Sequence, residues 1–357
     1  MKKLELTGKR LLNIVLRGIF GHRPQKLLKS TEIQKVLVLR LDQRIGNGIM
    51  LLPLLKAIRK SSPDIEIHLL LHHTVAELIK EYSPGLVDNF WMYNQNVLLS
   101  HPLKFLKWIT KLRNEHFDLI LSSHNPDNFS LSQAILGRWC KPRLLAGFQW
   151  GDSDYYYDAS IFSGTEKHYS DSQLDLWRRF DDTAVLEWGG LNVPQEAVEN
   201  AFHDWNLDIG KPCALIWLGA TGNKTLPPDL VAFLFEQILK KSGMHVQFAL
   251  GKADASHMNE FPEWIRSNTL VWEKPLADTA KFFAGFQLFV SGDTGPMHIA
   301  AALDIPTLTI FTHSRMEQYG YRDGQRHFAL NYSGTAAEKD AIVEILHFLQ
   351  KLNVDAC

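Results

Sequence analysis

Residues 291–298 read SGDTGPMH and join an apolar, aromatic-rich stretch, Phe282–Val290, to the small-residue run IAAA at 299–302. This layout predicts a strand, a glycine-containing turn and the start of a helix. Backbone N–H groups and the positive helix end then point to one place, where an anion can bind. Asp293 or Thr294 can cap the helix. A capped crossover without a ligand is the alternative, and Asp, Thr and His side chains within one turn favour the ligand.

Length and charge bound the rest of the chain. Its 357 residues suit two domains better than one core, and 45% hydrophobic with 22% charged residues is typical of a globular protein. The formal net charge of the chain is −1, but the charges are unevenly distributed. Residues 1–30, which we call the basic leader, hold eight Lys/Arg and one acid, a net charge of +7, so the remaining residues carry −8. An acidic body argues against nucleic acid as a partner, and the leader indicates an anionic surface.

The leader does not read as a signal peptide. Its apolar stretch, residues 11–20, is interrupted by Asn13 and Arg17, and no small-residue cleavage site follows. A helix lying on a membrane surface and a solvated or locally docked extension both fit this pattern. Three cysteines without pairing or metal-ligand spacing indicate a reducing compartment. We therefore expect a cytoplasmic protein, peripheral on the inner face of the cytoplasmic membrane.

Strands and helices alternate twice along the sequence. The predicted strands are 35–41, 65–71, 117–122 and 143–147 in the first half, and 213–218, 245–250, 269–272, 288–291 and 306–311 in the second. The alternation predicts an α/β protein with two Rossmann-like, doubly wound domains that bind ligands at the carboxyl ends of their strands. We place the first domain at 31–190, a linker at 191–211 and the second domain at 212–357.

Three loops that follow predicted strands carry polar groups suited to chemistry. Residues 42–48 read DQRIGNG, with a turn predicted over 43–48. Asp42 can act as a general base or cap the next helix, and Arg44 can neutralise phosphate. Residues 219–225 read GATGNKT and offer N–H donors, hydroxyls and one lysine for a diphosphate, although the P-loop spacing is absent. The third loop is the Asp293 loop quoted above. Asp254 follows another strand and suits a ribose diol. The histidines show no paired spacing, so we predict no metal site.

Taken together, these loops resemble glycosyltransferase family 9, which includes the lipopolysaccharide heptosyltransferases. The resemblance covers residues 35–330 and is most specific over 291–312, SGDTGPMHIAAALDIPTLTIFT. The family has a DTGxxH loop, an alanine-rich helix and a P(T/V)xxxF/Y strand at this spacing. The opening strand, its glycine loop and Pro53-Leu54-Leu55 also match.

The resemblance implies a GT-B fold, with two Rossmann-like domains facing each other across a cleft. The second domain would hold a nucleotide-sugar donor and the first would receive the acceptor. Inverting, metal-independent transfer without a cofactor is implied, with a base that deprotonates the acceptor. The implied donor-binding residues are Asp293, Thr294, Gly295 and His298 at the sugar and diphosphate, Thr221 and Lys224 at the phosphates, and Asp254 at the ribose.

One position departs from the family pattern. The family's opening loop has Gly-Asp, with the aspartate as the expected base, whereas this chain has Gly46-Asn47. An amide cannot act as a general base near neutral pH. Asp42 could replace it, another carboxylate could, or the protein could bind without turnover. We favour Asp42 as the catalytic residue, with Arg44, Gly46 and Asn47 in the acceptor-side loop.

The sequence thus predicts a glycosyltransferase that moves a sugar, with heptose from ADP-heptose as the first candidate, to a lipopolysaccharide core or related glycolipid. The alternatives are a GT-B transferase for another surface polysaccharide and a catalytically impaired nucleotide-sugar-binding protein. A dinucleotide dehydrogenase is disfavoured, because no GxGxxG follows any predicted strand.

Overall fold

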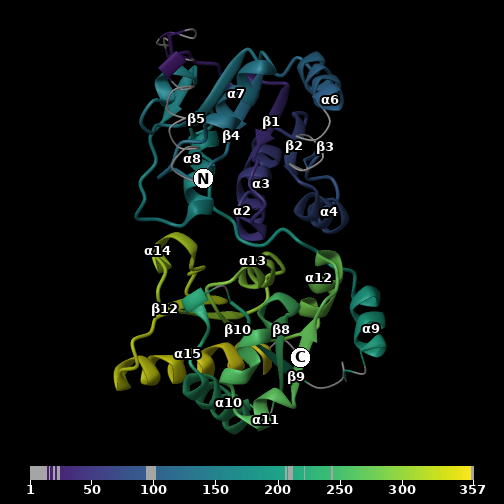
Figure 1. Ribbon diagram of the computed structural model, residues 1–357, viewed down its shortest axis with the longest axis vertical. Helices are drawn as coiled ribbons and strands as arrows, with labels where there is room; N and C mark the ends of the chain where they lie inside the picture. The colour runs from purple at the N-terminus through teal and green to yellow at the C-terminus, as the bar shows by residue number, and fades with distance from the viewer. Residues whose placement is uncertain are drawn as a thin grey trace. The chain divides into compact units, whose positions relative to one another are not determined.

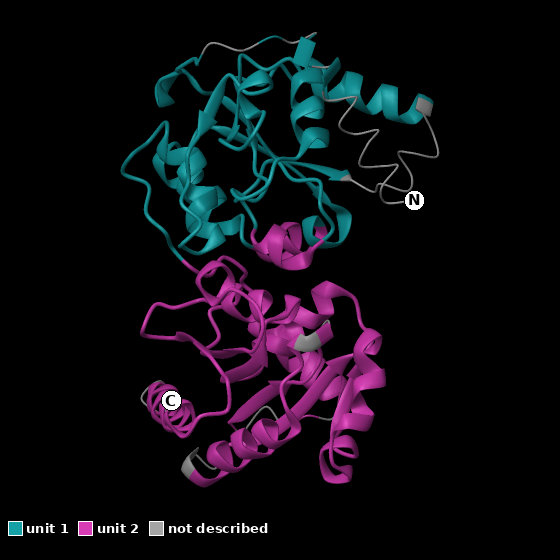
Figure 2. Ribbon diagram, turned by 60° about the vertical axis from the view of Figure 1, so that its left-hand side comes forward, with its two compact units in different colours: residues 1–43, 50–76, 84–187 teal, residues 44–49, 77–83, 188–357 magenta. Residues whose placement is uncertain are grey.

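The computed structural model describes residues 25–93, 102–205, 212–220, 222–242 and 244–354, together with 14–15, 17–18, 21 and 207. The chain divides into two compact units, coloured separately in Figure 2. Unit 1 comprises residues 1–43, 50–76 and 84–187, and unit 2 comprises 44–49, 77–83 and 188–357. Two short segments from the N-terminal half of the sequence therefore belong to the C-terminal unit.

Unit 1 contains a parallel sheet in the order β3-β2-β1-β4-β5-β6 (Figure 1). Val36 of the central strand lies opposite Ile67 on one side and Leu119 on the other. The central strands read as continuous apolar runs because both faces of a parallel sheet are covered. The strands are β1 Lys35–Leu39, β2 Glu66–His72, β3 Asn89–Tyr93, β4 Leu119–Ser122, β5 Leu144–Phe148 and β6 Ala159–Ile161.

Unit 2 repeats this architecture with a second parallel sheet, in the order β12-β11-β10-β7-β8-β9. Counted from its first strand, each sheet has the doubly wound order 3-2-1-4-5-6, which confirms two Rossmann-like domains. The order reverses beside β1 in unit 1 and beside β7 in unit 2. The strands are β7 Cys213–Trp217, β8 His245–Gly251, β9 Thr269–Trp272, β10 Leu288–Gly292, β11 Thr307–Phe311 and β12 His327–Asn331.

Helices connect these strands. In unit 1 they are α3 Leu52–Ser61, α6 Pro102–Asn114, α7 Leu131–Trp139 and α8 Tyr169–Arg178, and α4 His73–Tyr82 contributes to both units. In unit 2 they are α2 Ile45–Ile49, α9 Gln195–Asp204, α10 Pro228–Ser242, α11 Glu263–Arg266, α12 Leu276–Ala284, α13 Gly295–Ala302, α14 Met316–Tyr319 and α15 Ala336–Val354. The 3₁₀ segments are η1 Ser30–Glu32, η2 Ser153–Tyr155, η3 Gly222–Lys224 and η4 Lys252–Glu260.

The turn predicted at residues 43–48 is wrong, because α2 begins at Ile45. Gly46, Asn47, Gly48 and Ile49 are all buried there, so packing overrides the low helix propensity of two glycines. The short strands β3, β6 and β12 and helix α9 were not predicted from the sequence.

Most of the basic leader lies outside the described residues. Of its described part, Arg17 pairs with Asp152 at 2.9 Å and donates a hydrogen bond to the Tyr155 hydroxyl at 3.1 Å. The guanidinium also lies 4.3 Å from the centre of the Tyr155 ring. These contacts favour the locally docked alternative for this part of the leader. No described helix is both long enough and apolar enough to cross a membrane.

Candidate active site

Two candidate loops of unit 2, the one that contains Lys224 and the one that contains Asp293, meet where the strand order reverses, between β7 and β10. The Lys224 ammonium forms an ion pair with Oδ2 of Asp293. The carboxylate is buried at 7% exposure, whereas the lysine side chain is 37% exposed. A Cβ on Gly292 would lie 2.6 Å from the Lys224 carbonyl oxygen, so the close approach of the two loops requires glycine. The pair places a cation beside the start of α13, where a diphosphate can bind.

Helix α13 begins at Gly295 with Thr294 as its N-cap. The Thr294 side chain makes no capping hydrogen bond, so its hydroxyl is not used to close the helix end. The N-terminal N–H groups of a helix need an acceptor from elsewhere when no side chain supplies one. Phosphate or sugar oxygens would meet that requirement.

His298 lies on α13 and is buried, with its Nδ1 atom 3.0 Å from the Tyr321 hydroxyl. Burial lowers the pKa of His298 to about 4, and the nearby Lys224 charge acts in the same direction while Asp293 opposes it. The imidazole is therefore neutral near pH 7. Burial also raises the pKa of Tyr321, so its hydroxyl stays protonated.

The His298 ring lies directly against the backbone of Gly46 on α2, which belongs to the same unit. A Cβ at position 46 would overlap the ring, and a Cβ on Gly295 would be 3.8 Å from Ile45. The structure thus brings Gly46 of the opening loop together with the histidine of the DTGxxH motif. Asn47 beside it is buried at 6% exposure.

Replacing Gly46 with alanine should destabilise unit 2, because the new methyl group has no space beside the ring. We expect a loss of about 1–3 kcal/mol in the free energy of unfolding, the usual cost of overpacking. Urea denaturation would measure it. Gly164→Ala is the control, since a Cβ there meets nothing within 4 Å. In a His298→Ala background, Gly46→Ala should cost less free energy of unfolding, because the ring that the methyl group overlaps is gone. An equal cost in both backgrounds would contradict the assigned contact between position 46 and the His298 ring.

Asp254 lies in η4, after β8, and burial raises the pKa of its carboxyl. A Cβ on Gly219 would lie 2.5 Å from Oδ2 of Asp254 and 3.1 Å from the Trp217 indole nitrogen. Trp217 is 4% exposed, and its Nε1–H has no acceptor among the described residues. A buried donor without a partner costs about 1–3 kcal/mol, and a ligand hydroxyl would remove that cost. In the sequence, the only sign of a role for Trp217 is that it is an aromatic residue at the end of a predicted strand.

In unit 1 the corresponding reversal of strand order, between β1 and β4, is organised by Arg40. This guanidinium is 1% exposed and donates from Nη1 to the Ser123 carbonyl and from Nη2 to Asn125 Oδ1, each at 2.6 Å. Its Nε donates to Oδ2 of Asp42, also at 2.6 Å. Asp42 is therefore held in a fixed orientation. Burial, reinforced by the Arg40 charge, lowers the pKa of His124 to about 4.

Two predicted site residues remain to be placed, Arg44 and Thr221. Arg44 is exposed at the start of the segment that joins unit 2, and Thr221 lies outside the described residues.

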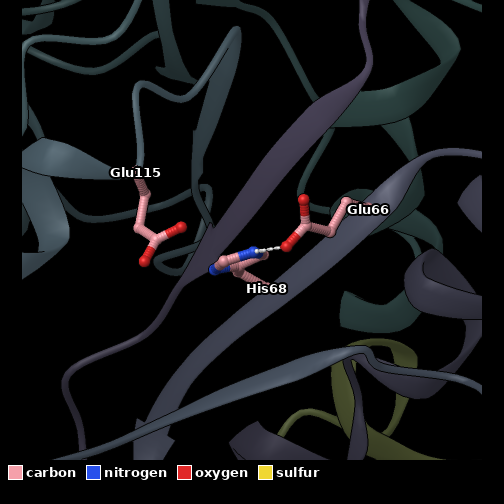
Figure 3. A group of neighbouring side chains, drawn as sticks. All are labelled: Glu66, His68 and Glu115. Carbon is pink, nitrogen blue, oxygen red and sulfur yellow. Dashed lines mark hydrogen bonds and ion pairs between the residues drawn. The ribbon is translucent and has the colours of Figure 1, made fainter.

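One group of described residues has the side chains of a metal site, namely Glu66, His68 and Glu115 (Figure 3). The Lys35 ammonium lies 3.1 Å from a carboxylate oxygen of each glutamate. Nε2 of His68 is 2.7 Å from Glu66, and its Nδ1 accepts a hydrogen bond from the Trp91 indole at 2.9 Å. Together with Lys35 and Trp91, the group forms a network of ion pairs and hydrogen bonds, and we assign no metal to it.

Acidification should weaken the fold through His298. Below pH 6.5 an unfolded histidine binds a proton that buried His298 does not bind until about pH 4. The free energy of unfolding should therefore fall over this interval, with His298 contributing at most about 1.4 kcal/mol per pH unit. His298→Gln should make urea-derived stability less steep in pH, and His124→Gln should act similarly. An unchanged slope in His298→Gln would show that His298 already titrates normally when folded.

The family model "Glycosyltransferase family 9 (heptosyltransferase)" matches residues 105–343. A protein described as a putative glycosyltransferase from Haemophilus influenzae is 25% identical over 300 residues, which cover 80% of this chain and 84% of that protein.

Solved structures show the same fold. A glycosyl transferase family 9 protein from Veillonella parvula matches with a TM-score of 0.68 at 15% identity, covering 93% of this chain and 97% of that one. The ADP-heptose LPS heptosyltransferase II of E. coli matches with a TM-score of 0.67 at 16% identity, covering 90% and 99%. E. coli heptosyltransferase WaaC with ADP matches with a TM-score of 0.65 at 17% identity, covering 87% and 99%. At these identities the likeness concerns the GT-B fold.

Proposed function

The chain belongs to glycosyltransferase family 9, and from this premise we propose that it transfers heptose from ADP-heptose to a lipopolysaccharide core or related glycolipid. The observation that carries the proposal is the ion pair of Lys224 with buried Asp293 beside the uncapped start of α13. A fixed cation, helix N–H groups and a neutral imidazole together suit a diphosphate bearing a sugar. A solved relative bound to ADP supports adenine as the first base to test.

In the proposed reaction the acceptor oxygen forms a bond to the anomeric carbon, and the bond from that carbon to the diphosphate breaks. Asp42 takes the acceptor proton, and configuration at the anomeric carbon inverts. Lys224 and the α13 N–H groups stabilise the negative charge that develops on the departing nucleoside diphosphate. Neutral His298 can hydrogen bond to the donor without adding a charge. No metal is required in this scheme.

We propose that Asp254 and Trp217 bind the donor ribose together. A hydroxyl that accepts from the Trp217 N–H can also donate to the Asp254 carboxylate. This arrangement would satisfy a buried donor and a desolvated carboxyl at once. Thr221 and Thr294 remain proposed phosphate and sugar contacts.

Calorimetric titration with ADP, UDP and GDP tests the donor site. We expect one nucleotide to bind, with a preference for ADP supporting heptose as the sugar. Lys224→Met should weaken binding about 10- to 100-fold, since charge-assisted hydrogen bonds contribute about 1.5–3 kcal/mol. Asp293→Ala should also weaken it, because the lysine loses its positioning partner. Lys240→Met is the control, as Lys240 forms an exposed pair with Glu236 at 3.0 Å.

The ribose contact adds an internal control to this titration. Trp217→Phe keeps the aromatic ring and removes the N–H, so affinity should fall about 3- to 10-fold. With a deoxyribose analogue of the same nucleotide, wild type and Trp217→Phe should bind alike. Wild type that binds none of the three nucleotides would overturn the proposed donor site.

The identity of the base is tested by turnover. Asp42→Asn should lower kcat about 10²- to 10⁴-fold, the range of general-base catalysis, with donor affinity unchanged. Exposed Asp64→Asn is the matched control. Asn47→Asp should not raise the rate, because position 47 is buried in α2. A large gain in kcat for Asn47→Asp would instead identify a catalytically impaired nucleotide-sugar-binding protein. That is the second candidate function, and it is supported by Asn47 at the position where the family has an aspartate.

A glycolipid acceptor requires contact with a membrane. We propose that the leader, with its net charge of +7, contributes attraction to an anionic leaflet. The acceptor could also belong to another surface polysaccharide, which the same donor-site geometry would serve.

A further inference from the structure

Helix α6 of unit 1 combines cations with exposed apolar side chains. Its sequence, PLKFLKWITKLRN, holds four Lys/Arg and no acid. Leu103 is 75% exposed and Leu106 is 58% exposed, values usual for charged side chains. Among the described side chains of the helix only Leu112 is buried. The pattern is that of a helix lying at a membrane interface.

A groove of about 670 Å³ lies between α6 and the end of α7. Its apolar lining comes from Phe105, Leu106, Ile109, Trp139 and Pro142, and we call it the α6–α7 groove. The Phe105 and Trp139 rings meet edge to face at 6.2 Å, and Trp139 remains 48% exposed. This volume would hold part of an acyl chain. Contiguous exposed apolar surface of this kind marks an interaction site.

The charges around the groove select an anionic partner. Arg138 in its lining is already paired with Asp158 at 2.8 Å. Within the part of the chain that the structure describes, five other cations on α6 and beside the groove have no ion-pair partner, namely Lys104, Lys107, Lys111, Arg113 and Lys141. Because the whole chain carries a formal charge of only −1, this basic face is local. An apolar groove with unpaired cations around it is complementary to a lipid with an anionic headgroup.

We propose that the α6–α7 groove docks this protein on an anionic lipid bilayer. Apolar side chains around the groove enter the acyl region, and the five cations contact headgroup phosphates. A chain of contacts connects this face to the leader, since Arg138 is paired with Asp158 and the Asp158 carbonyl accepts a hydrogen bond from the Lys26 N–H at 2.8 Å. Leader and groove would then supply the two signals that stable membrane binding requires. The proposed glycolipid acceptor explains why the protein would dock on a membrane, but the observations that support the docking face do not depend on it.

Cosedimentation of the full chain with vesicles tests the docking face, without any sugar donor. Phosphatidylcholine vesicles with and without phosphatidylglycerol are the probes. We expect binding only to the anionic vesicles and weaker binding at high salt. Each of Lys107→Gln, Lys111→Gln and Arg113→Gln should lower the partition coefficient about fivefold, the equivalent of about 1 kcal/mol per charge. The double variant Leu106→Ser, Trp139→Ser should lower the partition coefficient further, because two apolar side chains that would enter the acyl region are lost.

Matched changes in unit 2 are the controls. Lys240→Gln and Lys252→Gln remove exposed cations, and Phe348→Ser removes an apolar side chain that is 43% exposed. These variants should bind like wild type. Circular dichroism of every variant keeps loss of binding separate from loss of fold.

Three outcomes would overturn the docking face. Groove variants that bind like wild type, both in the full chain and after deletion of residues 1–24, would assign membrane binding elsewhere. Equal binding to uncharged vesicles would remove the role of the cations. If the wild-type protein does not bind vesicles but forms a dimer that Leu106→Ser dissociates, the groove is an interface with a second copy of the chain. Nucleotide titration is independent of all three, so the transferase proposal would stand in each case.

Discussion

Reversal of strand order beside the first strand of each sheet is the constraint on which both candidate sites depend. Where neighbouring parallel strands send their chains in opposite directions, the loops leave an opening that polar groups can occupy. Unit 1 fills this place with the buried Arg40 guanidinium, whose hydrogen bonds join the ends of β1 and β4 and orient Asp42. Unit 2 uses the pair of Lys224 and Asp293. Each charge is tolerated because it is partnered, as a lone buried ion would cost far more.

The contact of Gly46 with His298 adds a second level of organisation to unit 2. It joins the opening glycine loop to the DTGxxH segment, although these lie far apart in the sequence. The burial that lowers the pKa of His298 comes partly from such close packing around the ring. Gly46 thus helps to set the charge state of His298, which is proposed to bind the donor. This physical relation between the two motifs does not depend on which residue acts as the base.

Much of this architecture was predictable, because the strands nearest each reversal are continuous apolar runs followed by glycine-rich polar loops. Residues 288–292 and the DTGxxH turn are clear examples. Three of the four outermost strands, β3, β6 and β12, were missed, whereas β9 was predicted. An edge strand pairs on one side only and needs little hydrophobic pattern, and β6 has only three residues. Helix α2 was missed because two glycines indicate a turn when the packing against His298 is not known. The unpartnered Trp217 N–H and the docking of Arg17 on Tyr155 are properties of three-dimensional contacts, which local sequence does not encode.

The exchange of segments between the two units has a consequence for any attempt to separate them. Unit 2 contains residues 44–49 and 77–83 as well as everything from Trp188 onward. A fragment cut at the boundary after Glu187 would lose α2 and uncover the imidazole and the start of α13. It would also lose Tyr82, whose carbonyl accepts a hydrogen bond from the Asn192 N–H at 2.7 Å. Unit 2, which holds the proposed donor site, is therefore not a transplantable module, and domain shuffling within this fold would have to carry these N-terminal segments along.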